Sequence, residues 1–186
     1  MIEGPSHSSE RALLFTGHLI DAPNRFDPRF PPNLEPAAAR AIAKVIAEIS
    51  PTIGIASAAR GGDILFHEAC QAQGIETIIV IPFAVSEFEK KSVSGLLTGQ
   101  WEQRFRSLLS RVGQSQVTQV DTRNSDNPFG ACNRAMLQQA QAIDPRPGLL
   151  ALWDGRKGDG PGGTAEMVRV IERLGGRIVI IDPSSL

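Results

Sequence analysis

Short apolar runs alternate with longer stretches of helical periodicity along the whole chain. The apolar runs predict strands at residues 12–16, 52–57, 75–82, 148–154 and 177–182, with a shorter candidate strand at 116–120. The periodic stretches predict helices at residues 36–49, 61–74, 86–112 and 164–174, and a further helix that begins at residue 127. The pattern therefore indicates a regular alternation of strands and helices.

The predicted strands are apolar on both faces, which is typical of parallel strands that helices cover on each side. We therefore predict an α/β fold, a doubly wound and mostly parallel sheet of about five to six strands flanked by helices, similar to the Rossmann fold. In such sheets ligands bind outside the C-terminal ends of the strands. Function is expected in the loops that follow Thr16, Ser57, Pro82 and Asp154.

Local sequence signals refine the predicted bounds and the buried faces of the helices. Ser86 and Glu89 have the spacing of a capping box, and Gly95 with Gly99 should divide the helical region that follows. The helix that begins at residues 127–128 should turn four apolar side chains to the core: Phe129, Cys132, Met136 and Ile143. The basic residues of the divided region are interpreted as a solvated face: Lys90, Lys91, Arg104, Arg106 and Arg111.

Composition narrows the class of protein. The 186 residues suit a single domain, here 11–186, behind a loose tail at 1–10. The net charge of −1 argues against nucleic acid as a partner, and no apolar stretch approaches the length of a membrane span. Cys70 and Cys132 are expected to be reduced thiols, as in a cytoplasmic protein. No cofactor is expected, and no metal site, because His67, Glu68 and Cys70 lie too close together in the sequence.

The loop at 158–166, GDGPGGTAE, carries the strongest chemical signal. Four glycines lie between a predicted strand and a predicted helix, where free N–H groups at the helix start suit a phosphate. Gly162, Gly163 and Thr164 would hold the anion, and Glu166 would lie in the first helical turn. The alternative is a flexible connection. Gly158, Gly160 and Gly163 also match G-x-G-x-x-G, but the tight turn of a dinucleotide site is missing.

Two other strand ends carry candidate ligand-binding residues. After the second strand, SAARGGD (57–63) offers Ser57, a cation at Arg60, close backbone approach at Gly61, and Asp63. Asp63 would either accept from a ribose hydroxyl or cap the following helix.

After the first strand come Gly17 and His18, where His18 is a hydrogen-bond donor, a general acid or base, or a structural histidine. Residues 21–32 are a candidate lid. Asn133 and Arg134 are polar residues on an otherwise apolar helix face, and they are placed provisionally at the site.

Several of these stretches together resemble the SLOG superfamily, which includes the lonely-guy phosphoribohydrolases and the DNA-processing Smf/DprA proteins. The similar stretches are LLFTGHLIDAP (13–23), ASAARGGDILFHEAC (56–70), VIPF (80–83), NRAMLQQA (133–140) and ALWDGRKGDGPGGTAEM (151–167). GHLIDAP and WDGRKGDGPGGTA are most similar to a sensor-like branch found in bacterial signalling and conflict-system proteins. The resemblance implies a domain that binds a nucleotide or nucleotide-derived messenger at the strand ends, commonly as a dimer.

The same resemblance leaves an enzyme open. Lonely-guy enzymes cleave the N-glycosidic bond of nucleoside monophosphates with a Pro-Gly-Gly-x-Gly-Thr motif followed by paired acids. The stretch at 161–166, PGGTAE, reproduces part of that motif and keeps one acid, Glu166. The run from Asp154 to Glu166 also resembles that of nucleoside deoxyribosyltransferases, although its Thr-to-Glu spacing differs.

Two hypotheses follow from the residues and the resemblance. In the first, the protein is a nucleotide sensor whose ligand has its phosphate on the 158–164 loop, with Arg60 neutralising charge. Base stacking would use Phe83, Phe30 or Trp153, and the signal would pass to a second copy of the chain or to a partner effector protein. In the second, the protein is an N-ribosyl hydrolase or transferase, with Glu166 and His18 as catalytic candidates.

Overall fold

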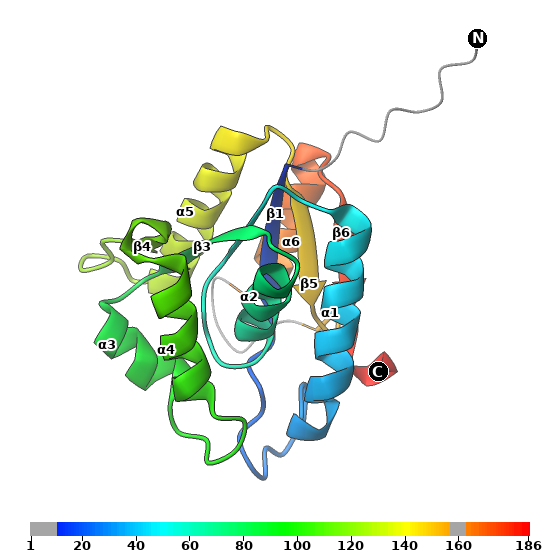
Figure 1. Ribbon diagram of the computed structural model, residues 1–186, viewed down its shortest axis with the longest axis vertical. Helices are drawn as coiled ribbons and strands as arrows, with labels where there is room; N and C mark the ends of the chain where they lie inside the picture. Colours follow the sequence, from blue (N-terminus) through cyan, green and yellow to red (C-terminus); the bar gives the residue numbers. More distant parts are fainter. Residues whose placement is uncertain (1–10, 157–162) are drawn as a thin grey trace.

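The computed structural model describes residues 11–156 and 163–186, and the predicted tail at 1–10 and the glycines at 158–162 lie outside the described residues. The described chain forms one parallel sheet with strand order β4-β3-β2-β1-β5-β6 (Figure 1). The strands are β1 (Ala12–Gly17), β2 (Ile53–Ala56), β3 (Glu76–Ile81), β4 (Val117–Gln119), β5 (Gly148–Leu152) and β6 (Ile178–Ile181). The fold is thus the six-stranded, Rossmann-like α/β architecture that the sequence predicts.

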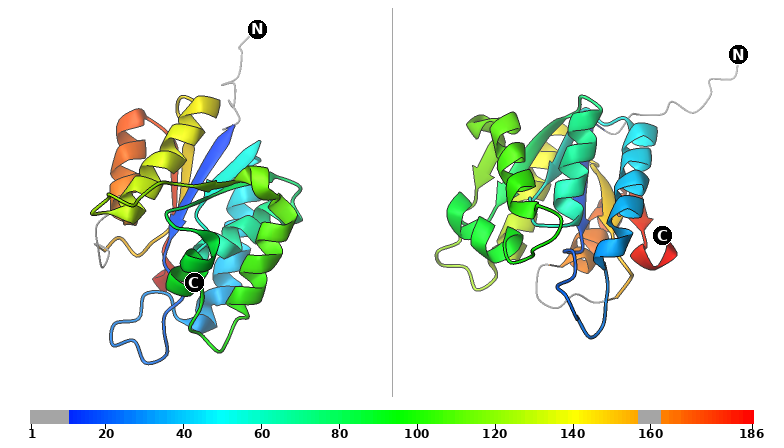
Figure 2. Two further views of the ribbon diagram at one scale, coloured as in Figure 1. Left: turned by 90° about the vertical axis from the view of Figure 1, so that its left-hand side faces the viewer. Right: turned by 60° about the horizontal axis from the view of Figure 1, so that its bottom comes forward.

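Helices cover both faces of the sheet. The long helices are α1 (Glu35–Ile49), α2 (Gly62–Ala72), α4 (Trp101–Val112), α5 (Pro128–Ile143) and α6 (Thr164–Leu174). Shorter elements are the helix α3 (Val85–Phe88), the π-helical turn η2 (Glu89–Val93) and the 3-10 turns Pro32–Leu34, Gln114–Gln116 and Pro183–Ser185. Figure 2 shows α5 and α6 on one face of the sheet and α1, α2 and α4 on the other.

The central strand β1 supplies both halves of the core. Leu13 and Phe15 belong to the apolar cluster under α1, α2 and α4, whereas Ala12 and Leu14 belong to the cluster under α5 and α6. This division follows from the alternation of side chains along a strand. Because β1 is buried on both faces, its run of apolar residues is the sequence signature of its central place.

The packing of α2 on the sheet depends on a glycine in the neighbouring strand. The rings of Phe15 and Phe66 stack with centroids 5.0 Å apart. A Cβ at Gly54 would lie 2.8 Å from the Phe66 ring, so only glycine lets the phenyl ring lie flat against β2. A large, rigid apolar contact therefore fixes α2, and with it the loop that precedes this helix.

The order of the strands positions the site. From β1 the chain builds outward through β2, β3 and β4, then returns to the other side of β1 for β5 and β6. The direction of winding therefore reverses between β1 and β5, and the loops that leave these two strands diverge at their carboxyl ends. These ends lie at the bottom of Figure 1.

The helical region after β3 confirms one prediction and corrects another. The chain is non-helical around Gly95 and Gly99, as expected. The capping box of Ser86 and Glu89 is wrong, because the N-cap of α3 is Ala84, two residues before Ser86, and no side-chain cap is present there. Within the described residues, no helix has the length and apolarity needed to cross a membrane.

Replacement of Phe66 should show how much the aromatic packing stabilises the fold. We expect Phe66→Ala to lower the free energy of unfolding by about 3–5 kcal/mol, because the fully buried ring leaves a cavity. Phe26 is 103% exposed, so Phe26→Ala is the matched control and should leave stability nearly unchanged. Urea denaturation of the two variants measures both values, and equal losses would contradict this assignment of the core.

Candidate functional site

A pocket of about 500 Å³ opens at the carboxyl ends of β1, β2 and β5. We call it the switch-point pocket, because it lies where the winding of the sheet reverses. Its walls come from five parts of the chain. They include Thr16, Gly17 and His18 at the end of β1; Ser57, Ala59 and Asp63 after β2; Lys91 and Ser92 after β3; Phe129, Asn133 and Met136 of α5; and Trp153 after β5 with Gly163 and Thr164 at the start of α6. Its volume and its mixed apolar and polar lining are typical of small-molecule sites.

One side of the pocket brings the end of β1 against the start of α6. The hydroxyl oxygens of Thr16 and Thr164 are 3.1 Å apart and form a hydrogen bond. Gly163 is the N-cap of α6, and no side chain of the described residues caps this helix. The first turn of an 11-residue helix, with its partial positive charge, therefore faces the pocket.

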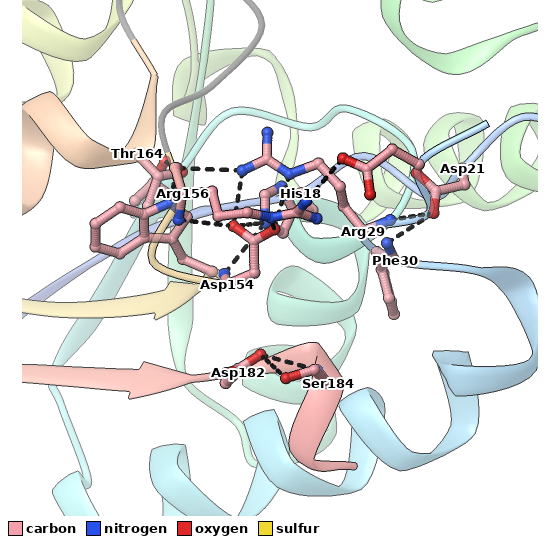
Figure 3. A network of polar contacts seen from close by, with 12 residues as sticks. His18, Asp21, Arg29, Phe30, Asp154, Arg156, Thr164, Asp182 and Ser184 are labelled. Carbon is pink, nitrogen blue, oxygen red and sulfur yellow. Dashed lines mark hydrogen bonds and ion pairs between the residues drawn. The ribbon is translucent and has the colours of Figure 1, made fainter. Parts of the chain in front are cut away.

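Behind this wall, Asp154 is the centre of a group that we call the Asp154 cluster: His18, Arg29, Asp154 and Arg156 (Figure 3). Arg29 donates from Nε and Nη2 to the two carboxylate oxygens of Asp154, at 2.9 and 2.7 Å. Arg156 donates from Nε to Oδ2 at 2.7 Å. Hydrogen bonds from Arg29 first, and then from Arg156, hold the pKa of Asp154 far below its usual range.

His18 belongs both to the Asp154 cluster and to the wall of the pocket. Its Nε2 atom is 3.3 Å from the backbone nitrogen of Asp154 and 3.2 Å from the Oδ1 atom of that residue. Burial, followed by the charge of Arg29, lowers the pKa of His18 below its ordinary value. The ring is therefore neutral at pH 7, and its Nε2 either accepts from the Asp154 N–H or donates to Oδ1.

The candidate lid at 21–32 is tied down rather than loose. Asp21 accepts hydrogen bonds at Oδ2 from the backbone nitrogens of Arg29 and Phe30, at 2.7 and 2.8 Å. Arg156 also reaches the loop, with its Nη1 atom 2.7 Å from Oδ2 of Asp27. The Phe30 ring is 0% exposed, so its predicted role in base stacking is wrong: it anchors this segment in the core.

Two titratable side chains on α2, one acidic and one basic, have shifted pKa values, and in each case burial favours the neutral form. Burial raises the pKa of Asp63 to about 7, although its Oδ2 accepts a hydrogen bond from the backbone nitrogen of Ala59 at 3.1 Å. Burial lowers the pKa of His67 to about 4. His67 Nε2 lies 2.7 Å from the carbonyl oxygen of Ser57 and donates to it, which fixes the end of β2.

The structure gathers seven of the predicted residues in the walls of the pocket: Gly17, His18, Ser57, Asp63, Asn133, Gly163 and Thr164. Asp154 lies directly behind them, and Gly162 falls outside the described residues. Arg60, Gly61, Arg134 and Glu166 are not among the described residues that line the pocket.

The structure gives these remaining residues other surroundings. Arg60 donates from Nη1 to the carbonyl oxygen of Ser94, and Gly61 pairs with Leu19 in an isolated bridge. A side chain at Gly61 would collide with the backbone of Ile20, so this glycine joins two loops. Arg134 and Glu166 are exposed.

The pocket also contains residues that the sequence analysis missed or misplaced. Phe129 was expected in the core, but it is 47% exposed and lines the pocket, because it lies in the first turn of α5. Lys91 is 53% exposed, as expected for a solvated face, and it also lines the pocket. Arg104 instead binds Glu68 and Glu35. Arg29 carries no sequence signal beyond its place in a proline-rich loop.

No group of His, Cys, Asp and Glu within residues 11–156 and 163–186 is arranged to hold a metal ion. Cys70 and Cys132 are both buried as free thiols, and burial raises the pKa of each to about 12. Neither thiol is therefore a nucleophile at neutral pH.

The chain is similar in structure to DNA processing protein A (DprA) from Streptococcus pneumoniae, with a TM-score of 0.41 and 12% sequence identity. The similarity covers 90% of this chain and 57% of that one, so this chain spans little more than half of the DprA chain. No protein-family model matches the sequence, and no curated protein matches it significantly. The site is therefore interpreted from its own residues.

The Asp154 cluster should contribute strongly to stability. Arg29 and Asp154 expose only 5% and 9% of their side chains, so Arg29→Gln leaves a poorly hydrated carboxylate. We expect Arg29→Gln to lower the free energy of unfolding by about 3 kcal/mol. The double variant Arg29→Gln/Asp154→Asn should lose less in total than this single variant, because it no longer buries an unpaired charge. Arg123 and Asp121 form an exposed pair of the same chemistry, so Arg123→Gln is the control and should have little effect. Equal effects of the two arginine substitutions would contradict a structural role for the cluster.

The raised pKa of Asp63 predicts a distinct pH dependence. Between its unfolded value, about 4, and its folded value, about 7, the folded state holds a proton that the unfolded state has lost. This contribution to stability is complete below pH 4 and disappears as the pH rises to 7. Asp63→Asn abolishes the titration, so the stability of the variant relative to the wild type should rise across this interval. Urea denaturation at several pH values measures the difference, and a flat difference would place Asp63 in the ionised form.

Proposed function

We propose that the switch-point pocket binds a nucleotide or a nucleotide-derived signalling molecule. The observation that carries the proposal is the meeting of β1 and α6 at the Thr16–Thr164 hydrogen bond, inside a pocket of about 500 Å³. A phosphate at this point would receive hydrogen bonds from the N–H groups of the first turn of α6. Thr16 and Thr164 would offer hydroxyl donors to the same anion.

The charges around the pocket favour an anion that binds locally, rather than a long polyanion. The three arginines near this wall are matched by three aspartates: Arg25, Arg29 and Arg156, and Asp21, Asp27 and Asp154. The attraction would therefore come mainly from the backbone dipoles of α6, with Lys91 further along the wall. A single phosphate group suits such a site better than nucleic acid does.

Aromatic side chains give the rest of the ligand apolar surfaces. Trp153 and Phe129 both line the pocket, and Phe129 packs edge-on against Phe83 at a centroid distance of 5.7 Å. A planar base would stack on such rings. The motif similarity to the SLOG superfamily supports the same ligand class, and a sensor of this kind would act through a second copy or a partner effector protein.

The N-ribosyl hydrolase or transferase alternative depends on Glu166. Its side chain is exposed and does not belong to the described lining of the pocket. Binding without turnover is therefore the function that the geometry favours.

A panel of mononucleotides, dinucleotides and cyclic nucleotides tests the proposal by thermal shift. A true ligand at 100 times its Kd should add ~2.7 kcal/mol of stability. Gly163→Val should weaken binding of any hit at least about tenfold, because the branched side chain screens the amides of α6. Its backbone φ of −77° accepts valine, so the fold should survive. Glu172→Gln, an exposed substitution in the same helix, is the control.

The results distinguish the alternatives. If no nucleotide stabilises the protein, or if Gly163→Val binds the hit as the wild type does, the proposed site is wrong. If chromatography detects free base released from the bound nucleotide, the protein is instead an N-ribosyl hydrolase or transferase. Glu166→Gln should then remove turnover and keep binding.

A further inference from the structure

Three residues in the lining of the switch-point pocket suit neutral hydrogen bonding and stacking. They are Asp63 at the start of α2, and Phe129 and Asn133 on α5. Phe129 is 47% exposed although it lies in a pocket wall, so part of its ring is available to a ligand. The same pocket therefore offers an aromatic surface and a carboxyl group.

The two oxygens of Asp63 differ in what they already bind. Oδ2 accepts the backbone N–H of Ala59 at 3.1 Å. Oδ1 has no hydrogen-bond partner within the described parts of the chain, and Asp63 forms no ion pair there. Since Asp63 lines the pocket, a ligand can bind at Oδ1, and Oδ2 keeps a second acceptor site beside its bond from Ala59.

The hydrogen bond from Ala59 favours the carboxylate form of Asp63, but burial outweighs it, and the neighbouring side chains add no compensating positive charge. His67, on the same helix, is neutral because burial lowers its pKa to about 4. Cys132 on α5 is a neutral thiol, and Lys91 on η2 pairs with Glu87 at 2.8 Å. His18, across the pocket, is neutral as well, and Arg29 is bound to Asp154.

Burial accordingly raises the pKa of Asp63 to about 7, so below that pH the side chain is a carboxylic acid. With Oδ2 accepting from Ala59, the proton belongs on Oδ1, where it forms an O–H donor. A buried neutral acid of this kind donates one hydrogen bond and accepts another.

We propose that Asp63 reads the edge of a nucleobase and selects adenine or cytosine over guanine and uracil. Adenine and cytosine present a ring nitrogen acceptor beside an amino donor. The Oδ1 hydroxyl would donate to the ring nitrogen, and Oδ2 would accept from the amino group. Guanine and uracil present a ring N–H at the corresponding position, which would face the O–H donor. This inference rests on the proposed function and adds the class of base.

Calorimetric titration with AMP, CMP, GMP, UMP and inorganic phosphate tests the inference at about pH 6 and about pH 8. At the lower pH we expect AMP or CMP to bind at least about tenfold more tightly than GMP and UMP, because a mismatched buried donor is left unpaired. At the higher pH the carboxylate form should reduce this preference.

Two substitutions separate a specific role of Asp63 from a structural one. In Asp63→Asn the amide oxygen takes the place of Oδ2 and the NH₂ group takes the place of the hydroxyl. This variant should keep the base preference and lose its dependence on pH. Asp63→Ala should lose the preference and still bind phosphate. Should the alanine variant not fold, the asparagine variant carries the test by itself, and Glu172→Gln serves as the control in both cases.

The outcomes separate this inference from the proposed function. If nucleotides bind with no base preference, or if Asp63→Asn reverses the preference towards GMP, the role of Asp63 is overturned and the proposed function stands. If phosphate binds as tightly as every nucleotide, the base makes no favourable contact with Asp63, and the inference fails. If neither nucleotides nor phosphate binds, the proposed function fails and the inference fails with it.

Discussion

The carboxylate of Asp154 is the contact on which the geometry of the site depends. It is the only side chain of the Asp154 cluster with a negative charge, and it binds groups from two different strand exits. Arg29 and His18 belong to the segment after β1, and Arg156 to the segment after β5. Arg29 and Arg156 both donate to this one carboxylate, so it joins the two segments at the point where the strand exits diverge. The Asp154 cluster thus holds the segments after β1 and β5 together where they leave the sheet and form one wall of the pocket.

Much of the fold follows from short-range features of the sequence. The strands β1 and β5 are recognisable by their unbroken apolar runs, ALLF and LLAL, and α5 is recognisable because Asn127 and Pro128 mark its start. Asn127 accepts from the Gly130 nitrogen, as its residue type predicts. The capping box at Ser86 was wrong although serine is a better N-cap than Ala84, the residue that holds this position. Phe88 of the same short helix is fully buried, so tertiary packing contributes to the placement of α3 where the local signal does not.

The site was predictable only in part, and the reason is physical. Strand exits can be located from the pattern of apolar runs, so Thr164, His18 and Asp63 were found. Arg29 was not predicted, because its role depends on its hydrogen bonds to Asp154, which lies 125 residues further along the chain. Phe129 was assigned to the core from its helical spacing, which does not tell how far the helix extends beyond the sheet.

The two shifted groups on α2 have a consequence for the proton balance of the whole molecule. Near pH 5, folding takes up a proton at Asp63, whose pKa rises to about 7, and releases one from His67, whose pKa falls to about 4. The two contributions oppose each other, so burial of both side chains exchanges almost no net protons with the solvent there. Near this pH, neighbouring turns of one helix thereby keep an acid protonated and a base unprotonated, with opposite and nearly equal effects on proton uptake.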